Sequence, residues 1–164
     1  MRKKLLVIVM MLAMVFAITA CGKKSEGSLM FDVPAGFEYN TEVRCYLGPN
    51  YPEELANINY YSYENDGTFG MLTETSIESA MEESLSESFL EDIDITITEW
   101  EKIKVDGYKA FVYAYDFESG GIEYEQIQVA INGKDYIHYV TFTDYAGTSY
   151  KDDFYTCIKN MRFE

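Results

Sequence analysis

Hydrophobic residues recur at helical spacing in two stretches of the chain. From Ile77 to Phe89 an apolar residue occupies every fourth position, which places these side chains on one face of a helix. Thr75, with Glu78 three residues later, predicts a capping box at the start of this helix. A second helix is predicted over residues 149–161, with one apolar stripe formed by Phe154, Cys157, Ile158 and Met161.

The remaining hydrophobic segments have the pattern of β-strands. Asp106-Gly107 and Asn132-Gly133 are two-residue hairpin signals, and Glu118–Gly121 is a looser turn. Residues 93–143 are therefore predicted to form an antiparallel meander of four strands. The predicted strands are residues 29–33, 43–47, 58–63, 93–105, 108–117, 122–131 and 134–143.

The expected hairpin registers divide the meander into two apolar faces. If Asn132-Gly133 is the whole loop, Ile127 pairs with His138 and Val129 with Tyr136. The aliphatic face then carries Ala110, Val112, Ala114, Ile127, Val129, Ile131, Tyr136, His138, Val140 and Phe142. The other face carries Trp100, Phe111, Tyr113, Tyr115, Phe117, Tyr124, Gln126, Gln128, Ile137 and Tyr139. Because both faces are apolar, both must be partly covered, which predicts an α+β fold with an antiparallel β-sheet flanked by helices.

The N-terminus has the anatomy of an export signal. Arg2, Lys3 and Lys4 precede an uncharged, mostly apolar run over residues 5–20. This run is shorter than the ~20 apolar residues that span a bilayer core, and it ends in small residues. We therefore expect residues 1–20 to be a signal peptide, with a retained membrane anchor as the alternative.

The sequence Ile18-Thr19-Ala20-Cys21, followed by Gly22, resembles the lipobox of bacterial lipoproteins. The resemblance implies that Cys21 becomes the mature N-terminus and carries a thioether-linked diacylglycerol. Residues 21–28 would then be the lipidated cysteine and a short flexible tether, and residues 29–164 a single α+β domain. The protein is expected to be extracytoplasmic and anchored to the cell membrane through this lipid.

The chain is strongly acidic, with a formal net charge of −15 over 164 residues. Nucleic acid is excluded as a partner, because binding to phosphate backbones needs clustered Lys and Arg. The same net charge disfavours attachment to an anionic membrane through protein side chains. It favours a cationic protein or peptide as the partner.

Cysteine and histidine usage limits the available chemistry. Lipidation of Cys21 leaves Cys45 and Cys157, which have two interpretations outside the cytosol, a disulfide bridge or two separate buried thiols. With one histidine and no C-x-x-C sequence, a structural zinc site is not expected. No cofactor-binding motif is present either, so neither a metal nor a cofactor is predicted.

A second resemblance rests on the order of elements and on short strings within them. These strings are Phe31–Phe37, Val105–Ala110, Tyr136–Phe142 and Met161–Phe163. With the helix between the first two strings and the closing helix, they resemble the PsbP/DcrB-like fold of many small bacterial lipoproteins. The resemblance implies an α/β/α sandwich around an antiparallel sheet. It also implies a non-catalytic accessory or assembly role, and it transfers no functional residue.

Candidate catalytic residues are scarce. His138 is the single histidine, so any histidine-dependent triad must use it, and its place on the aliphatic face predicts a packed, hydrogen-bonded ring. The carboxylates near Glu91 and those near Glu64 lack the spacing of a calcium-binding loop. A solvated acidic face, or weak calcium capture, are the interpretations left for them. We expect no catalytic residue and no enzymatic activity.

Aromatic residues make up 16% of the chain, and they suggest the one candidate binding surface. Either these rings fill a half-buried sheet face, or part of them form an exposed platform for a peptide, glycan or protein. The candidate platform is Trp100, Tyr113, Tyr115, Tyr124, Gln126 and Tyr139. The first helix decides between the two, because a platform that it covers is core.

The leading function is a membrane-tethered binding or accessory module for an envelope protein or peptide. The alternatives are a small-ligand-binding lipoprotein and an uncharacterised hydrolase.

Overall fold

The computed structural model describes residues 27–145 and 149–164. The predicted signal peptide, Cys21 and most of the predicted tether lie outside these residues. The elements in chain order are β1 (Leu29–Met30), β2 (Glu38–Asn40), β3 (Cys45–Leu47), β4 (Asn57–Glu64), the 3₁₀ helix η1 (Thr68–Met71), α2 (Glu74–Phe89), β5 (Thr96–Val105), β6 (Tyr108–Ser119), β7 (Ile122–Asn132), β8 (Tyr136–Tyr145), α3 (Lys151–Lys159) and β9 (Arg162–Phe163).

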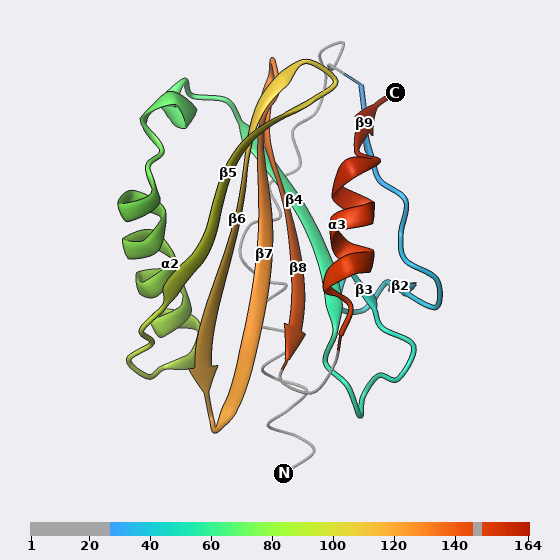
Figure 1. Cartoon of the computed structure of the whole chain (residues 1–164), viewed down its shortest axis with the longest axis vertical. Coiled ribbons are helices and arrows are strands. Elements are labelled where there is room, and N and C mark those ends of the chain that lie inside the picture. Colours follow the sequence, from blue (N-terminus) through green and yellow to red (C-terminus); the bar gives the residue numbers. More distant parts are fainter. Residues whose placement is uncertain (1–26, 146–148) are drawn as a thin grey trace.

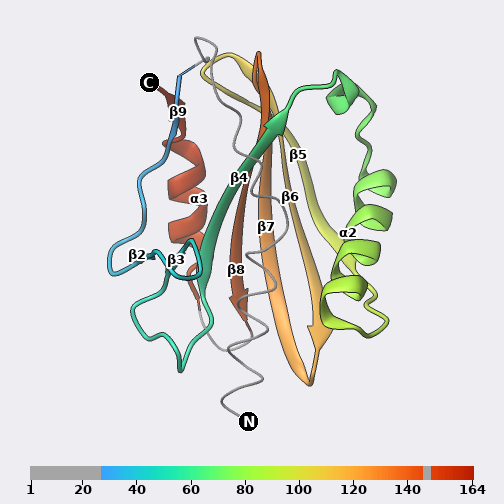
Figure 2. The same ribbon diagram turned by 180° about the vertical axis from the view of Figure 1, so that it is seen from behind.

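Seven strands form one antiparallel sheet in the order β2-β3-β4-β8-β7-β6-β5, and β1 pairs with β9 separately. The predicted four-stranded meander is β5 to β8, which neighbour one another in sequence order. Figures 1 and 2 show α2 on one side of this sheet and α3 on the other. The predicted fold, an antiparallel sheet flanked by helices, is confirmed.

Two hairpins of the meander have tight two-residue turns. Val105 pairs with Tyr108, and the turn residues Asp106 and Gly107 have φ values of 47° and 85°, the positive values that a type I′ turn requires. Ser119 pairs with Ile122, so the turn between β6 and β7 is Gly120-Gly121 alone. The looser turn predicted over residues 118–121 is wrong, because both strands continue to the glycine pair.

The predicted register between β7 and β8 is also wrong. Asn132 pairs with Ile137, and Ile127 therefore pairs with Phe142 instead of His138. The loop is longer because Asn65, just after β4, donates side-chain hydrogen bonds to Asn132 Oδ1 and to the Gly133 carbonyl, both at 2.8 Å. The error is four residues along β8, an even number, so every side chain keeps its predicted face.

Both helices begin and end slightly differently from the prediction. α2 begins after Thr73, whose Oγ1 accepts from Ser76 N at 3.2 Å, while Ser76 Oγ accepts from Thr73 N at 2.9 Å. The capping box is therefore formed by Thr73 and Ser76, and its predicted assignment to Thr75 and Glu78 is wrong. α3 is shorter than predicted but buries Phe154, Cys157 and Ile158 as expected. No helix in the described residues has the length and hydrophobicity that crossing a bilayer requires.

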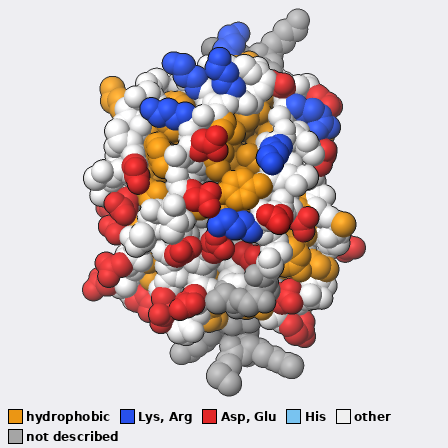
Figure 3. Space-filling model, in the orientation of Figure 1, with side chains coloured by type: hydrophobic (Ala, Val, Ile, Leu, Met, Phe, Trp, Pro, Cys, Tyr) orange, Lys and Arg blue, Asp and Glu red, His pale blue; other side chains and the backbone are white. Residues whose placement is uncertain are grey.

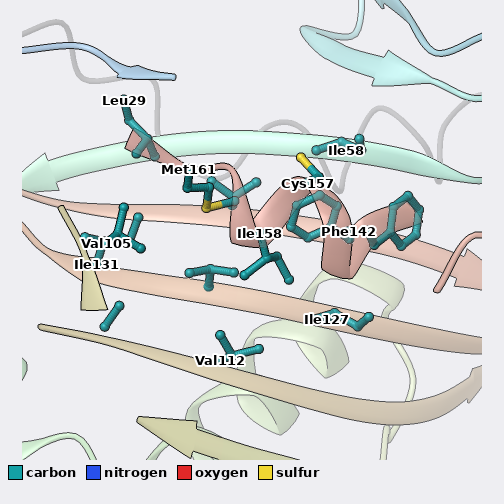
Figure 4. Close-up of a cluster of buried hydrophobic side chains, with 14 of the residues drawn as sticks. Leu29, Ile58, Val105, Val112, Ile127, Ile131, Phe142, Cys157, Ile158 and Met161 are labelled. Atoms are coloured by element: carbon teal, nitrogen blue, oxygen red, sulfur yellow. The ribbon is translucent and has the colours of Figure 1, made fainter. Parts of the chain in front are cut away.

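The face toward α3, called the α3 face below, is an aliphatic core. The stripe of α3 lies over small and branched residues of the meander, as Figure 4 shows. Ala114 on β6 and Val129 on β7 are completely buried, and Phe142 on β8 lies 5.1 Å from Phe154 of α3 between ring centroids. The buried stripe of α3 and the aliphatic side chains of the strands thus form one continuous core.

Candidate functional site

The aromatic face of the sheet, called the α2 face below, is core and not an exposed platform. Tyr113, Tyr115, Tyr124, Gln126 and Tyr139 are all buried, and Trp100 is half-buried. α2 contributes Ile77 and Leu85 to the same apolar cluster, and Tyr115 Oη lies 3.7 Å from Met81 Sδ. Trp100 stacks on Phe111 and Tyr113 at centroid distances of 4.9 and 5.7 Å. The helix packs on the predicted platform, so the platform hypothesis is wrong.

Two polar ladders cross the α2 face from β6 to β8. In one, Tyr115 Oη donates to Gln126 Oε1 at 2.5 Å, and Gln126 Nε2 donates to Thr143 Oγ1 at 2.9 Å. The other repeats this arrangement two residues along each strand, with Tyr113 donating to the buried Gln128, whose Nε2 donates to Thr141 Oγ1. Gln126, predicted to present hydrogen bonds to a ligand, therefore satisfies protein groups.

Burial also keeps the phenol groups of these tyrosines protonated. It raises the pKa of Tyr113 and of Tyr115 well above the ordinary value for tyrosine. No buried side-chain nitrogen or oxygen in the described residues is left without a hydrogen-bond partner. The α2 face is thus a satisfied interior network that offers no open polar group to a ligand.

The two remaining cysteines are free, and the predicted alternative of a Cys45–Cys157 bridge is wrong. Cys45 lies in the α2-face cluster and Cys157 in the α3-face cluster, so the sheet separates them. Burial raises the pKa of Cys45 to about 11. It raises the pKa of Cys157 to about 12, with a smaller contribution from the Asp32 carboxylate. Both therefore stay protonated, as separate buried thiols.

His138 is a core residue, as predicted. It is buried on the α3 face, and its Nδ1 lies 2.9 Å from the hydroxyl of Tyr60 on the neighbouring strand. The ring also meets Phe163 of β9 edge-on at a centroid distance of 5.1 Å. These contacts hold the imidazole inside the fold.

Carboxylates gather at the end of the sheet formed by the β6–β7 turn, called the acidic end below. Asp116 pairs directly with Glu125 and Glu118 with Glu123 across the two strands. Like charges directly opposite each other destabilise a hairpin. Lys151 neutralises part of this charge, with its Nζ 2.6 Å from Glu125 Oε1.

An open pocket of about 450 Å³ lies at this acidic end. Glu118 and Glu123 line it together with Leu55 and Ile122, so the walls combine carboxylates with apolar surface. Tyr145 closes one side, since its Oη donates to the Glu53 carbonyl at 3.0 Å. Among the described residues, the lining consists of Pro52, Glu53, Leu55, Glu118, Gly121, Ile122, Glu123 and Tyr145.

Electrostatics around the pocket favour positive charge. Burial raises the pKa of Asp144, although its carboxylate accepts from Tyr145 N and Tyr150 N, both at 2.9 Å. Burial and then the Glu54 carboxylate raise the pKa of Tyr145. The smaller part of each shift comes from neighbouring carboxylates, and this like-charge part favours an incoming cation. The arrangement can attract and hold a cation, and the described lining residues include no nucleophile paired with a base.

Two of the carboxylates near Glu64 and Glu91 make hydrogen bonds within the protein. Asp66 Oδ1 accepts from Thr68 N at 2.9 Å and from Thr68 Oγ1 at 2.6 Å, and these hydrogen bonds lower its pKa. Glu91 accepts from Ser119 Oγ. In the described part of the chain, no three His, Cys, Asp or Glu residues are grouped so that they could hold a metal ion.

Sequence reasoning missed this pocket. The signal that it overlooked was the Gly120-Gly121 turn, because a turn at this glycine pair places Glu118 opposite Glu123. The other wall, Pro52 to Leu55, comes from a loop far away in the sequence. No local pattern predicts that this loop lies beside the turn.

Comparisons with known proteins identify the fold. No family model and no curated protein matches the sequence. The solution structure of cyanobacterial PsbP (CyanoP) from Synechocystis sp. PCC 6803 is similar with a TM-score of 0.60 at 13% identity, over 90% of this chain and 99% of that one. LpqN of Mycobacterium tuberculosis, described as involved in cell envelope biogenesis, is similar with a TM-score of 0.50 at 7% identity, over 85% and 82%.

A third similar structure comes from Bacteroides thetaiotaomicron, with a TM-score of 0.52 at 9% identity. It covers 83% of this chain and 45% of that one. At these identities the comparisons establish the fold alone. The chain has a PsbP-like α+β fold, which confirms that part of the predicted resemblance.

Proposed function

We propose that this protein is a membrane-tethered, extracytoplasmic lipoprotein that binds a cationic segment of an envelope protein or peptide without catalysing a reaction. The observation that carries the proposal is the open pocket at the acidic end, where the paired carboxylates of Glu118 and Glu123 meet apolar walls. A cationic segment would relieve the like-charge repulsion in this hairpin.

The pocket suits long basic side chains. Its volume of about 450 Å³ lies within the range of ligand sites. The stem of a Lys or Arg side chain packs against apolar walls such as Leu55 and Ile122, while the charged head reaches the carboxylates at the rim. The surrounding negative charge raises the association rate of cationic partners over longer distances.

Support for a non-catalytic role comes from the residues that most often carry catalysis. His138 packs inside the fold against Tyr60 and Phe163. Cys45 and Cys157 are buried thiols with raised pKa values. Support for the envelope comes from the predicted leader and the resemblance to a lipobox within residues 1–21, and from the fold similarity to LpqN.

The binding proposal is tested with a fluorescent lysine-rich peptide and the purified protein, by anisotropy across a range of salt concentrations. Replacing Glu118 and Glu123 by Gln is expected to weaken binding about tenfold and to flatten its salt dependence. The matched control replaces Glu83 and Glu87, two exposed residues of α2, which changes the net charge equally. Equal loss in both variants would show that binding follows net charge alone and would refute the pocket.

The anchor is tested separately, by mass spectrometry of the membrane fraction. The expected product begins at Cys21 with a diacylglyceryl group, and Cys21→Ala is expected to abolish both cleavage and membrane association. An unmodified N-terminus at Met1 in the wild type would refute the lipoprotein proposal. The alternative of a glycan or peptide bound on the aromatic sheet face loses its surface, because the residues of that face are buried.

A further inference from the structure

Lys and Arg residues gather at the end of the fold opposite the acidic end. This end, called the tether end below, contains the β5–β6 turn, the β7–β8 loop and β9. Figure 3 shows basic side chains mainly toward this end and acidic ones over the opposite half. The Lys and Arg residues on elements at this end are Lys102, Lys104, Lys109, Lys134, Lys159 and Arg162.

The clearest positive feature at this end is a cross-strand pair of lysines, whose connecting turn also carries Asp106. Lys104 on β5 lies directly opposite Lys109 on β6, and both side chains are exposed. Like charges in this position destabilise a hairpin. Arg162 is ion-paired with Asp32 and Glu164, whereas neither Lys104 nor Lys109 makes an ion pair within the described residues.

Strand β6 carries a like-charge pair of the opposite sign at its other end, where Glu118 faces Glu123 of β7. Lys109 and Glu118 are separated by nine residues of β6, which is about 30 Å along an extended strand. That distance is several Debye lengths at physiological salt, about 8 Å each. The two ends therefore act on their surroundings independently, although the net charge of the whole chain is −15.

The chain toward the predicted anchor leaves the fold at the tether end. β1 pairs with the C-terminus, with Ser28 N donating to the Glu164 carbonyl at 2.7 Å. Phe163 N donates to Asp106 Oδ2 at 2.6 Å, which joins this strand pair to the β5–β6 turn. Figure 1 shows the first described residues and the C-terminus at the same end of the sheet as that turn.

The tether is too short to separate this end from the membrane. Six residues, 21–26, lie between the described chain and its predicted lipid, counting Cys21 itself. Fully extended, they span about 20 Å, and a flexible chain of this length averages less. A domain tethered in this way keeps its attachment point close to the headgroups.

We infer that Lys104 and Lys109 dock the tether end on anionic lipid headgroups, so that the acidic end and its pocket point away from the membrane. The inference rests on the proposed lipid anchor at Cys21. Headgroup phosphates neutralise the paired lysines, and the carboxylates of the acidic end are repelled by the same surface. The negative net charge opposes adsorption of the whole protein to an anionic membrane. Because basic and acidic side chains lie at opposite ends of the fold, the membrane favours one orientation of a protein that is already anchored.

The test uses the full-length lipidated protein in vesicles of phosphatidylcholine with or without phosphatidylglycerol. Single cysteines replace Asn160 or Ser149, exposed residues at opposite ends of α3 that are about 16 Å apart along the helix. Each carries a fluorophore, and nitroxide-labelled headgroups quench it at contact distance. Buried Cys45 and Cys157 do not compete for the label. Vesicle flotation, measured in parallel, reports the anchor itself.

On anionic vesicles the probe at position 160 is expected to be quenched strongly and the probe at position 149 weakly. Replacing Lys104 and Lys109 by Gln is expected to reduce this difference to its value on neutral vesicles. The single replacement Arg44→Gln, at an exposed residue elsewhere on the surface, is the matched control for Lys104→Gln alone and is expected to preserve the difference. Equal quenching of the two wild-type probes, or a difference insensitive to Lys104 and Lys109, would overturn the orientation. Failure to float would overturn the anchor as well.

Discussion

The two faces of the central sheet both form core but are built in different ways. The α3 face is almost entirely aliphatic or aromatic hydrocarbon, with Val129, Val140 and Phe142 fully enclosed. The α2 face buries hydroxyl and amide groups in ladders such as Tyr115–Gln126–Thr143. One face is held by apolar packing, and the other combines packing with directional hydrogen bonds that fix the relative positions of three strands.

This difference determines how each face responds to mutation. A cavity in an apolar core loses transfer free energy and packing together, and nothing nearby compensates for it. A buried ladder contributes little net free energy when it is complete, but a broken ladder leaves polar groups unpaired. The α3 face should therefore be sensitive to side-chain volume, and the α2 face to incomplete hydrogen bonding.

The largest expected effect is a cavity on the α3 face. Phe142 is fully buried and contacts Phe154, so Phe142→Ala is expected to lower the free energy of unfolding by about 3–5 kcal/mol. Urea denaturation measures this. Met71→Ala, at a side chain that is 76% exposed, is the control and is expected to change stability by less than about 0.5 kcal/mol. A loss below about 1 kcal/mol at Phe142 would contradict an apolar α3 face.

The second effect separates the ladder from simple packing. Gln126→Leu leaves the hydroxyls of Tyr115 and Thr143 without their partners, and is expected to cost about 1–3 kcal/mol. Adding Tyr115→Phe and Thr143→Val removes those hydroxyls and is expected to restore most of the loss. The same denaturation experiment measures both variants. A triple variant as unstable as the sum of its single changes would mean that hydrogen bonding does not set the response of this face.

Sequence patterns predicted those features of the sheet that depend on period and hairpin order. The division into faces was correct even though the β7–β8 register was shifted, because a shift of four residues preserves side-chain direction. The stripe of α3 was also correct, since Phe154, Cys157 and Ile158 follow helical spacing within one short segment.

The errors come from contacts between distant segments. Asn65 sets the length of the β7–β8 loop from the end of another strand. Whether the aromatic face was covered depended on where α2 packs, and its apolar residues, such as Ile77, fit either outcome. The pocket needed the loop around Glu53 to meet the β6–β7 turn. Long-range packing of this kind leaves no periodic trace in a single sequence.

A smaller effect is expected at the polar rim of the α3 face. Lys151 lies 2.6 Å from Glu125 and 3.2 Å from Glu99, and all three side chains are partly exposed. Lys151→Met is expected to cost about 0–1 kcal/mol, because solvent screens such pairs. This loss should shrink at high salt. A cost as large as that of Phe142→Ala would show that α3 is held electrostatically.

The contacts of Glu99 at this rim also predict how the stability of the protein depends on pH. The hydrogen bond from Tyr155, followed by Lys151, lowers the pKa of Glu99. A lowered folded-state pKa contributes stability above the usual glutamate pKa, and this contribution is lost as the pH falls through the folded-state value. The Lys151→Met variant should therefore differ most from wild type near neutral pH and least below about pH 4. A difference that grew on acidification would contradict this assignment.

The smallest expected effect concerns the cysteines, one on each face. Because Cys45 and Cys157 lie in clusters on opposite sides of the sheet, a thiol reductant is expected to leave the melting temperature unchanged. A bridge closing a loop of this size would contribute roughly 4 kcal/mol, so reduction would produce a clear shift.

Burial raises the pKa of Cys45 to about 11 and of Cys157 to about 12, so both thiols should resist alkylation at neutral pH. In urea both should react, and the protein should gain two labels by mass beyond any label on Cys21. A melting temperature that falls on reduction, or rapid labelling of the folded protein, would mean that the sheet does not keep the two residues apart.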